Sequence, residues 1–495
     1  MIIGRKKELA LLQKVYDSKQ SEFVVVYGRR RIGKTFLIRE FFSKQDCVYF
    51  QVTGMQKGKM SLQIKKFIET LSLVFFDEIP LIAPDSWDGA FDLLHKQVVK
   101  SDKKVVVFID ELPWMASKKS GLLETIDYYW NHYWSARNNI VLVICGSSAS
   151  WIIKKIIQNK GGLHNRATCQ MQLLPFSLSE TEAFLHSRGI ALNHQHILKL
   201  YMALGGVPHY LNYVEKGRTA DEAIQAILFD QGAPLREEYT KLFTSLFNNA
   251  KIYMDLIKII GGKHSGVTRS DIRQQLAAGL GGRLTERLHD LTTAGFIQEL
   301  TPFGRSRGEY YKLSDEFCLF YLYWLETTGK KKLSADYWIK LSQTPQYHAW
   351  AGYSFEGICY KHGQKIIDAL NIKTATVIDS WRFVSKTEQD QGAQVDLLID
   401  RSDDAITLCE IKYTQAPFML DKAEAEALKK KIQIFKDKTK TQKQIFLVFI
   451  SANGLRETAY SNDMVSGRVI LEDFFDPTTT SPQSNRLPTR QPFDD

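Results

Sequence analysis

The feature that most constrains this chain is an apolar run followed at once by a glycine-rich loop. Residues 24–27 read VVVY, and residues 28–35 read GRRRIGKT. The second stretch matches G-x-x-x-x-G-K-[ST], and it has the strand before it and the helix after it that this pattern requires. The sequence therefore predicts a phosphate-binding loop between a buried strand and a helix.

Each residue type in this loop has a physical role. Gly28 and Gly33 let the backbone turn tightly, so that its N–H groups converge on phosphate oxygens. Lys34 adds a positive charge near the β- and γ-phosphates, and the Thr35 hydroxyl is a ligand for Mg²⁺. The following helix offers the positive end of its dipole to the same anion. The loop residues predicted to bind nucleotide are Gly28, Arg29, Arg30, Arg31, Ile32, Gly33, Lys34 and Thr35.

Length and composition favour a soluble chain of several domains. A chain of 495 residues suggests about three domains. No apolar run approaches the roughly 20 residues that cross a bilayer, and the N-terminus lacks the pattern of a signal peptide. The six cysteines lie far apart, which favours free thiols over disulfides or zinc ligands. We expect a cytoplasmic protein with no membrane partner, and a net charge of +10 is compatible with nucleic acid as a partner.

Two further motifs follow apolar runs. Residues 104–109 are followed by Asp110 and Glu111, where Asp110 is suited to hold Mg²⁺ and Glu111 to polarise the attacking water. Residues 140–145 are followed by a Gly-Ser-Ser turn, where Ser147 or Ser148 would contact the γ-phosphate or the water. An ordinary turn is the alternative for these serines. Parallel strands alternating with helices bind ligands at their carboxyl ends, and all three motifs fall there.

Together these motifs resemble a known family. Gly4-Arg5 before a helix, the loop at 28–35, the sequence IDELPW at 109–114 and the turn at 146–148 are similar to the archaeal and bacterial ATPase family of the signal-transduction (STAND) branch of AAA-type P-loop ATPases. The resemblance implies an ATPase core over residues 1–175, with ATP as ligand and Mg²⁺ as cofactor. It also implies that Arg166 either senses the γ-phosphate or bridges to a neighbouring subunit of a homo-oligomer.

A helical lid is expected over residues 176–250. Its Gly-Gly-Val-Pro corner looks like the family signature in which Pro208 approaches the nucleotide. Residues 251–315 contain three helical patterns and two alternating strands, an order that resembles a winged helix. The candidate DNA-binding residues of that module are Arg283 and Arg287 on the third helix and Arg305 and Arg307 on the wing. The alternative is a module that packs on the ATPase core and reads no double-stranded DNA.

An aromatic helical linker, 316–350, leads to a C-terminal module over 351–475. Asp396 on one predicted strand and Glu410-x-Lys412 on the next resemble a PD-(D/E)XK nuclease, and alternate residues of a strand share a face. Two carboxylates would hold a metal ion while the lysine orients water. Glu356, on the preceding helix, is a further candidate acid. Gln394 departs from the family, which often has an acid there.

The sequence thus predicts an α/β fold: a P-loop parallel sheet with a helical lid, a winged helix, a C-terminal restriction-endonuclease-like domain and a disordered tail over 476–495. The expected function is an ATP-hydrolysing switch coupled to a nuclease-like effector that acts at DNA. Two alternatives stay open: a nuclease fold that binds or packs without cleaving, and an ATP-binding scaffold that signals through protein contacts. Neither the trigger nor the oligomeric state follows from the sequence.

Overall fold

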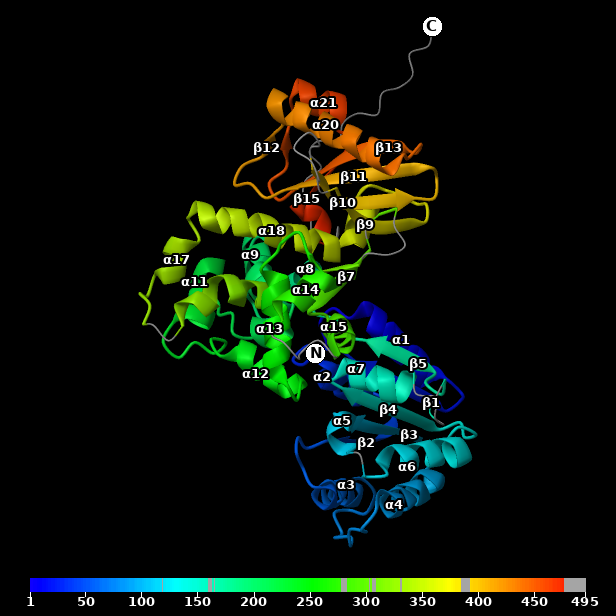
Figure 1. Ribbon diagram of the computed structural model, residues 1–495. Coiled ribbons are helices and arrows are strands. Elements are labelled where there is room, and N and C mark those ends of the chain that lie inside the picture. The colour runs from blue at the N-terminus through cyan, green and yellow to red at the C-terminus, as the bar shows by residue number, and fades with distance from the viewer. Residues whose placement is uncertain are drawn as a thin grey trace. The chain divides into compact units, whose positions relative to one another are not determined.

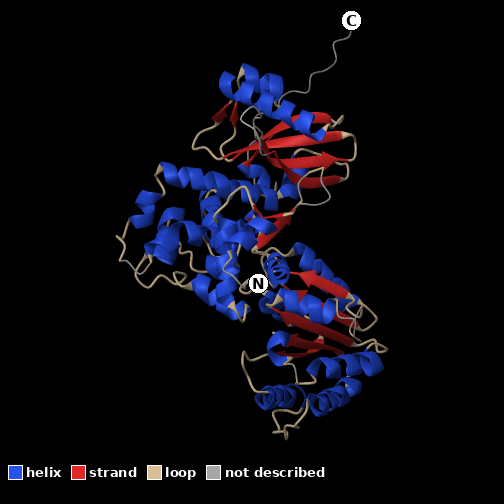
Figure 2. Cartoon of the chain, viewed as in Figure 1, coloured by secondary structure: helices blue, strands red, loops and turns tan. Residues whose placement is uncertain are grey.

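The computed structural model describes residues 1–117, 119–158, 163, 165–276, 283–301, 303–304, 309–329, 332–383 and 392–475. The chain divides into two compact units, Met1–Tyr347 and His348–Asp495, and each is described by itself. Figure 1 follows the chain from blue to red, and Figure 2 shows its helices and strands.

A five-stranded sheet forms the base of the first unit. Its strands, in the order β2-β3-β4-β1-β5, pair in parallel throughout. Because β4 lies between β1 and β3, the three strands that end in the predicted motifs are neighbours. The bounds are β1 (Glu22–Tyr27), β2 (Cys47–Thr53), β3 (Lys104–Asp110), β4 (Ile140–Gly146) and β5 (Cys169–Gln172). The predicted parallel α/β architecture is confirmed for this part of the chain.

Helices cover both faces of this sheet. On one face, Leu12 and Leu37 pack with Val24, Val26 and other strand residues; on the opposite face, α3, α4 and α6 supply a second apolar cluster. Burial on both faces explains why the strands are almost continuously apolar. The helices around the sheet are α1 (Lys6–Asp17), α2 (Lys34–Phe42), α3 (Met60–Phe75), α4 (Trp87–Lys100), α5 (Leu112–Met115), α6 (Leu122–Tyr129), η1 (Trp130–Trp134), α7 (Ala149–Ile152) and η2 (Ile153–Ile157).

A group of helices follows the sheet. Ser177 and Glu180 form a capping box at the start of the first of them. Residue 206, in the Gly-Gly corner after α9, must be glycine for steric reasons, because a Cβ there would lie 1.9 Å from the carbonyl oxygen of Phe176. The elements are α8 (Leu178–Ser187), α9 (His194–Leu204), α10 (Pro208–Leu211), α11 (Ala220–Ile224), η3 (Gln225–Phe229) and α12 (Glu238–Leu246).

The next stretch contains three helices and a small antiparallel sheet in the order β6-β8-β7. The three helices and the hairpin agree with the sequence pattern, and β6 is a third strand that the pattern did not predict. The assignment to the winged-helix class stays a prediction. The elements are α13 (Ala250–Gly261), β6 (Val267–Thr268), α14 (Arg269–Gln275), α15 (Leu284–Thr293), β7 (Ile297–Leu300) and β8 (Tyr310–Leu313).

The aromatic linker belongs largely to the first unit. Its Trp338 is 1% exposed and stacks on Phe229 of η3, with ring centroids 5.4 Å apart. Burial of its rings, rather than a role as a free connector, accounts for its composition. Its elements are α16 (Glu316–Phe320), η5 (Tyr321–Leu325), η6 (Glu326–Thr328), α17 (Tyr337–Leu341) and α18 (Pro345–Lys361), the last of which runs on into the second unit.

The second unit is built on a mixed sheet in the order β15-β13-β11-β10-β9. Strands β9, β10 and β11 are antiparallel, whereas β11, β13 and β15 run parallel. The elements are α19 (Gly363–Ala369), β9 (Thr376–Phe383), β10 (Ala393–Arg401), β11 (Ala405–Lys412), β12 (Phe418–Met419), α20 (Lys422–Thr439), β13 (Gln444–Ser451), β14 (Leu455–Arg456), α21 (Ala459–Met464), β15 (Gly467–Ile470) and η7 (Leu471–Phe474). Among the helices that the structure describes, none has both the length and the apolar character of a membrane span.

Candidate functional site: a phosphate loop at the carboxyl edge of the sheet

The phosphate loop connects β1 to α2, as predicted. Gly28 has φ 148°, and a Cβ there would lie 2.2 Å from the carbonyl oxygen of Leu173, so glycine is required for the loop to pass β5. Gly33 has φ 91°, in the left-handed region that favours glycine. Arg31 also has a positive φ, of 73°, which a side chain adopts only under local constraint.

Lys34 is buried and folded back on its own loop. Its Nζ donates to the carbonyl oxygens of Gly28 and Arg29, both at 2.9 Å. These two bonds hold the ammonium group against the backbone that a phosphate chain would contact. Its predicted role, a positive charge near the β- and γ-phosphates, stays a prediction that this placement allows.

Thr35 and Asp110 meet across the sheet edge. The Thr35 hydroxyl donates to Oδ2 of Asp110 at 2.8 Å, although 75 residues separate them. The other carboxylate oxygen of Asp110 accepts the N–H of Glu111 at 3.1 Å. Hydroxyl and carboxylate oxygens are the donors that Mg²⁺ prefers, so this pair fits a magnesium ion bound together with a triphosphate.

Glu111 is held by the turn after β4. Its Oε2 accepts two hydrogen bonds from Ser147, one from the backbone N–H at 3.0 Å and one from Oγ at 2.9 Å. Of the two serines considered from the sequence, the structure places Ser147 beside the carboxylate. Glu111 has φ 49°, so its backbone conformation is also unusual.

Helices α10 and α12, which follow the sheet in the chain, contact the loop on its arginine-bearing side. Nη1 of Arg31 lies 2.9 Å from Oε2 of Glu238 on α12, and the hydroxyl of Tyr210 on α10 donates to Oε1 of the same carboxylate at 3.0 Å. Pro208 begins α10, two residues before Tyr210. Burial, together with the nearby charge of Arg31, lowers the pKa of His209, which agrees with a packing role for this histidine.

Arg166 lies apart from this site. It is exposed, and it precedes Thr168, whose N–H donates to the carbonyl of Phe23 near the start of β1. The phosphate loop follows the other end of β1, roughly 13 Å further along the strand. The prediction that Arg166 senses a γ-phosphate in its own subunit is therefore not supported by this placement, while the bridging alternative stays a prediction.

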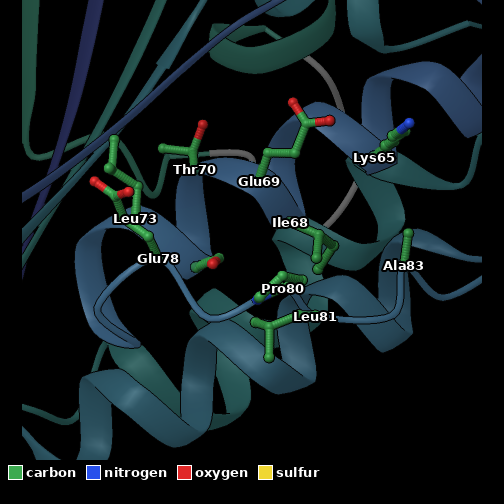
Figure 3. Close-up of a pocket in the computed structure, with 10 residues that line it drawn as sticks. Lys65, Ile68, Glu69, Thr70, Leu73, Glu78, Pro80, Leu81 and Ala83 are labelled. Atoms are coloured by element: carbon green, nitrogen blue, oxygen red, sulfur yellow. The ribbon is translucent and has the colours of Figure 1, made fainter.

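A separate cavity of about 650 Å³ lies between α3 and the segment that follows it (Figure 3). Its lining includes Ile68, Leu73 and Glu78, together with Pro80 and Leu81. None of the phosphate-loop or strand-end residues lines this cavity, so it is not the nucleotide site.

The candidate DNA-binding residues of the third helix lie close to the ATPase core. Helix α15 carries Glu286, whose carboxylate pairs with Lys154 of η2 at 2.8 Å. Arg283 is exposed at the start of α15, and Arg287 is half-buried on it. These contacts agree with the packing alternative for this helix. Arg305 and Arg307 lie outside the described residues.

In the second unit, the predicted nuclease-like residues gather on β10 and β11. Leu397 of β10 pairs with Cys409 of β11 in the antiparallel ladder. Asp396 and Glu410 are the adjacent residues in the sequence, so they lie on neighbouring strands at the same level of the sheet. Nζ of Lys412 lies 3.0 Å from Oε1 of Glu410. Asp396 accepts a long bond, 3.4 Å, from the N–H of Ile411.

A residue that the sequence analysis missed completes this cluster. Lys431 of α20 donates to Oε2 of Glu410 at 2.7 Å, so two lysines flank one carboxylate. No motif marks Lys431, since its helix is rich in lysine. Glu356, half-buried on α18, lies near enough to the buried Cys359 thiol to add, with Asp396, to the rise that burial produces in its pKa.

The two carboxylates of this cluster have opposite pKa shifts. Burial, and then the charge of Glu410, raises the pKa of Asp396 to about 6. Burial alone would also raise the pKa of Glu410, but Lys431 and Lys412 together lower it below its ordinary value. Among the described residues, no group of three or more histidine, cysteine or acidic side chains forms a metal site, so the pair Asp396 and Glu410 is what this cluster offers a metal ion.

Comparison with known proteins supports the assignment of the first site. Residues 2–214 match the profile of a family described as an ATPase domain predominantly from Archaea. The uncharacterised protein MJECL04 of Methanocaldococcus jannaschii is 26% identical over 330 residues, which are 65% of this chain and 68% of that protein. The uncharacterised ATP-binding protein MJ0423 of the same organism is 38% identical over 45 residues, 9% of this chain and 76% of that protein.

Several solved structures are similar at a lower level. The Walker-type ATPase of Pyrococcus abyssi has a TM-score of 0.47 and 17% identity, covering 65% of this chain and 96% of that one. The ORC1 protein of Aeropyrum pernix, solved in complex with DNA, has a TM-score of 0.36 and 13% identity, covering 65% of this chain and 92% of that one. A STAND protein with a tetratricopeptide repeat sensor from Pyrococcus horikoshii has a TM-score of 0.31 and 18% identity, covering 74% of this chain and 51% of that one.

The loop, the paired carboxylates and the parallel sheet define a P-loop ATPase. Residues 2–214 belong to the family of ATPase domains that occurs predominantly in Archaea.

Proposed function

We propose that this ATPase is a molecular switch in which nucleotide binding is coupled to the helical lid and to the segment after it. The observation that carries the proposal is that Arg29 and Arg31, inside the phosphate loop, form ion pairs with Asp315 and Glu238, which lie outside the ATPase core. A loop that only hydrolysed ATP would need neither contact. Binding of a triphosphate in the loop therefore affects the stability of both contacts with the later segments.

Hydrolysis in this arrangement uses the residues at the sheet edge. Lys34 exchanges its two backbone carbonyl partners for phosphate oxygens, and Thr35 and Asp110 are the residues that would hold magnesium. A bound magnesium ion supplies positive charge to the phosphate oxygens during transfer. Glu111 is suited to orient the attacking water, and Ser147 fixes the direction of its carboxylate.

The switch would act through the remaining modules at DNA. Supporting this proposal are the net charge of +10 and the helix-and-hairpin order of residues 251–315. A salt titration tests it: binding of a DNA duplex, measured with ATP, ADP and no nucleotide, falls steeply with salt if lysines and arginines contact phosphates. The absence of binding in every nucleotide state would instead favour the alternative of a scaffold that signals through protein contacts.

A second candidate function, phosphodiester cleavage by the second unit, is favoured by the cluster of Asp396, Glu410, Lys412 and Lys431. Supporting it are two carboxylates and two lysines within one small region of a mixed sheet. The test is cleavage of plasmid and single-stranded DNA with Mg²⁺ or Mn²⁺, with and without ATP. Loss of cleavage in both Asp396→Ala and Lys412→Ala would support an ATP-gated nuclease. No cleavage under any condition would leave a nuclease-like fold that only binds or packs.

A further inference from the structure

The side chain of Arg29 leaves the phosphate loop and enters the segment around β7, β8 and α16. Its Nη1 donates to Oδ2 of Asp315, 286 residues later in the chain. Arg29 is 2% exposed and Asp315 is 3% exposed, so both charges are removed from water. Contact between the two groups is then the main compensation for their burial.

Asp315 is fixed by its own surroundings. Its Oδ1 accepts the N–H of Cys318 at 2.8 Å and so caps the start of α16. Its backbone N–H donates to the carbonyl of Phe296 at 3.2 Å, and the N–H of Ser314 donates to the same carbonyl at 2.9 Å. The carboxylate that receives Arg29 is thus part of the turn that joins β8 to α16.

Phe296 contacts the guanidinium group of Arg29 as well. Its ring lies under the guanidinium of Arg29, with 5.2 Å from the guanidinium carbon to the ring centroid. Among the described residues, no acceptor forms a hydrogen bond with Nε or Nη2 of Arg29. Asp315 and the ring of Phe296 are therefore the groups that compensate this charge, and loss of the carboxylate leaves it buried without an anion.

The same arginine also takes part in placing Lys34 of the phosphate loop. The carbonyl oxygen of Arg29 accepts a hydrogen bond from Nζ of Lys34 at 2.9 Å. A single residue therefore connects Lys34, through its backbone, to Asp315, through its side chain. A shift of the Arg29 side chain also moves the Arg29 carbonyl oxygen, which accepts the hydrogen bond from Lys34.

We infer that Asp315 is a positioning residue for ATP binding. Through Arg29 it holds the phosphate loop in the conformation that receives the triphosphate, although it belongs to no ATPase motif. By thermodynamic reciprocity, ATP in the loop alters the stability of the turn at Asp315 and of the first turn of α16. The phosphate loop and the turn at residues 314–318 respond to nucleotide as one element.

The variant Asp315→Asn tests this coupling with little change of shape. Asparagine is also a good helix N-cap, so the bond to the N–H of Cys318 can be kept while the negative charge is lost. We expect the KM for ATP to rise at least about fivefold, within the usual range of coupling between sites, with a smaller change in kcat. The rise in Tm that ATP produces should shrink in parallel, and Asp315→Glu should recover part of it.

The matched control is Glu326→Gln. Glu326 forms an ion pair with Lys258 at 2.5 Å in the same unit, and it is 36% exposed. This control should keep the wild-type KM. A wild-type KM for Asp315→Asn, or a loss of kcat and stability with KM unchanged, would overturn the inference.

Hydrogen–deuterium exchange of the wild-type protein provides a second readout that needs no folded variant. ATP with Mg²⁺ should change the exchange of the amides at residues 316–320, which Asp315 caps. Exchange of the peptide around Lys258 on α13 serves as the internal reference and should stay constant. Equal exchange at 316–320 with and without saturating ATP would contradict the coupling.

Discussion

Ser147 donates two hydrogen bonds to one oxygen of Glu111, from its backbone N–H at 3.0 Å and from its hydroxyl at 2.9 Å. The carboxylate expected to orient water is thereby fixed by the strand that lies between the phosphate loop and Asp110. Sequence-distant groups meet here because three neighbouring parallel strands end at one edge.

This relationship predicts different effects for two substitutions. Glu111→Gln should lower kcat for ATP hydrolysis by roughly 10²-fold or more, since it removes the carboxylate that would polarise the attacking water and accept its proton, while ATP affinity changes little. Ser147→Ala should lower kcat less, because the backbone N–H still contacts Glu111. Steady-state ATPase kinetics separate these results, and a larger kcat loss in Ser147→Ala than in Glu111→Gln would contradict the roles assigned.

The contact between Thr35 and Asp110 predicts a change in metal dependence. Thr35→Ala removes a hydroxyl that is suited to bind Mg²⁺, so the concentration of Mg²⁺ giving half-maximal turnover should rise by about tenfold. Thr35→Ser keeps the hydroxyl and is the matched control. An unchanged magnesium requirement in Thr35→Ala would show that this hydroxyl is not a ligand.

The close approach of Gly206 to Phe176 predicts a destabilising alanine. A Cβ at this position would lie 1.9 Å from a backbone oxygen, so Gly206→Ala forces the chain at residue 206 away from the backbone of Phe176. The free energy of unfolding should fall by about 1–3 kcal/mol. The control is Gly352→Ala, where a Cβ meets nothing within 4 Å, and thermal unfolding of both variants provides the comparison.

The raised pKa of Asp396 predicts a pH-dependent effect on stability. Because burial raises its pKa from 3.8 to about 6, the folded state holds this proton more tightly than the unfolded state. Its contribution to stability is therefore greatest below about pH 4 and is lost as pH rises through about 6. The groups that face it are Glu410, Lys412 and Lys431.

Asp396→Asn isolates that contribution. At pH 7 the variant should be more stable than the wild type by at most about 3 kcal/mol, and the difference should shrink toward pH 4. Unfolding is measured in EDTA, so that metal binding does not compensate the charge. Equal stability of the two proteins at both pH values would contradict a raised pKa.

Much of the ATPase site follows from the sequence because each part is a local pattern. The loop at 28–35 is a continuous motif, and Asp110, Glu111 and Ser147 each follow an apolar run. Parallel strands then bring their carboxyl ends together. The strand β2 and the helices α3 and α4 were missed, since no chemical motif drew attention to residues 47–100.

Other site residues leave no local signal. The partner of Arg29 is 286 residues away, and the contact between Lys431 and Glu410 depends on how α20 packs on its sheet. Arg166 was assigned its role from its position between two family motifs. That position does not indicate at which edge of the sheet the residue lies. Long-range packing, rather than spacing, determines all three.

ATP turnover by Lys34→Ala is the direct test of the phosphate loop. It is compared with the wild type at equal concentration and saturating Mg²⁺, and Lys14→Ala, which changes an exposed residue of α1, is the control. Lys34 is the group expected to leave the carbonyls of Gly28 and Arg29 for phosphate oxygens. We expect steady hydrolysis by the wild type and the control, and no detectable binding or turnover by Lys34→Ala. Wild-type turnover by Lys34→Ala would contradict the assignment of the phosphate loop.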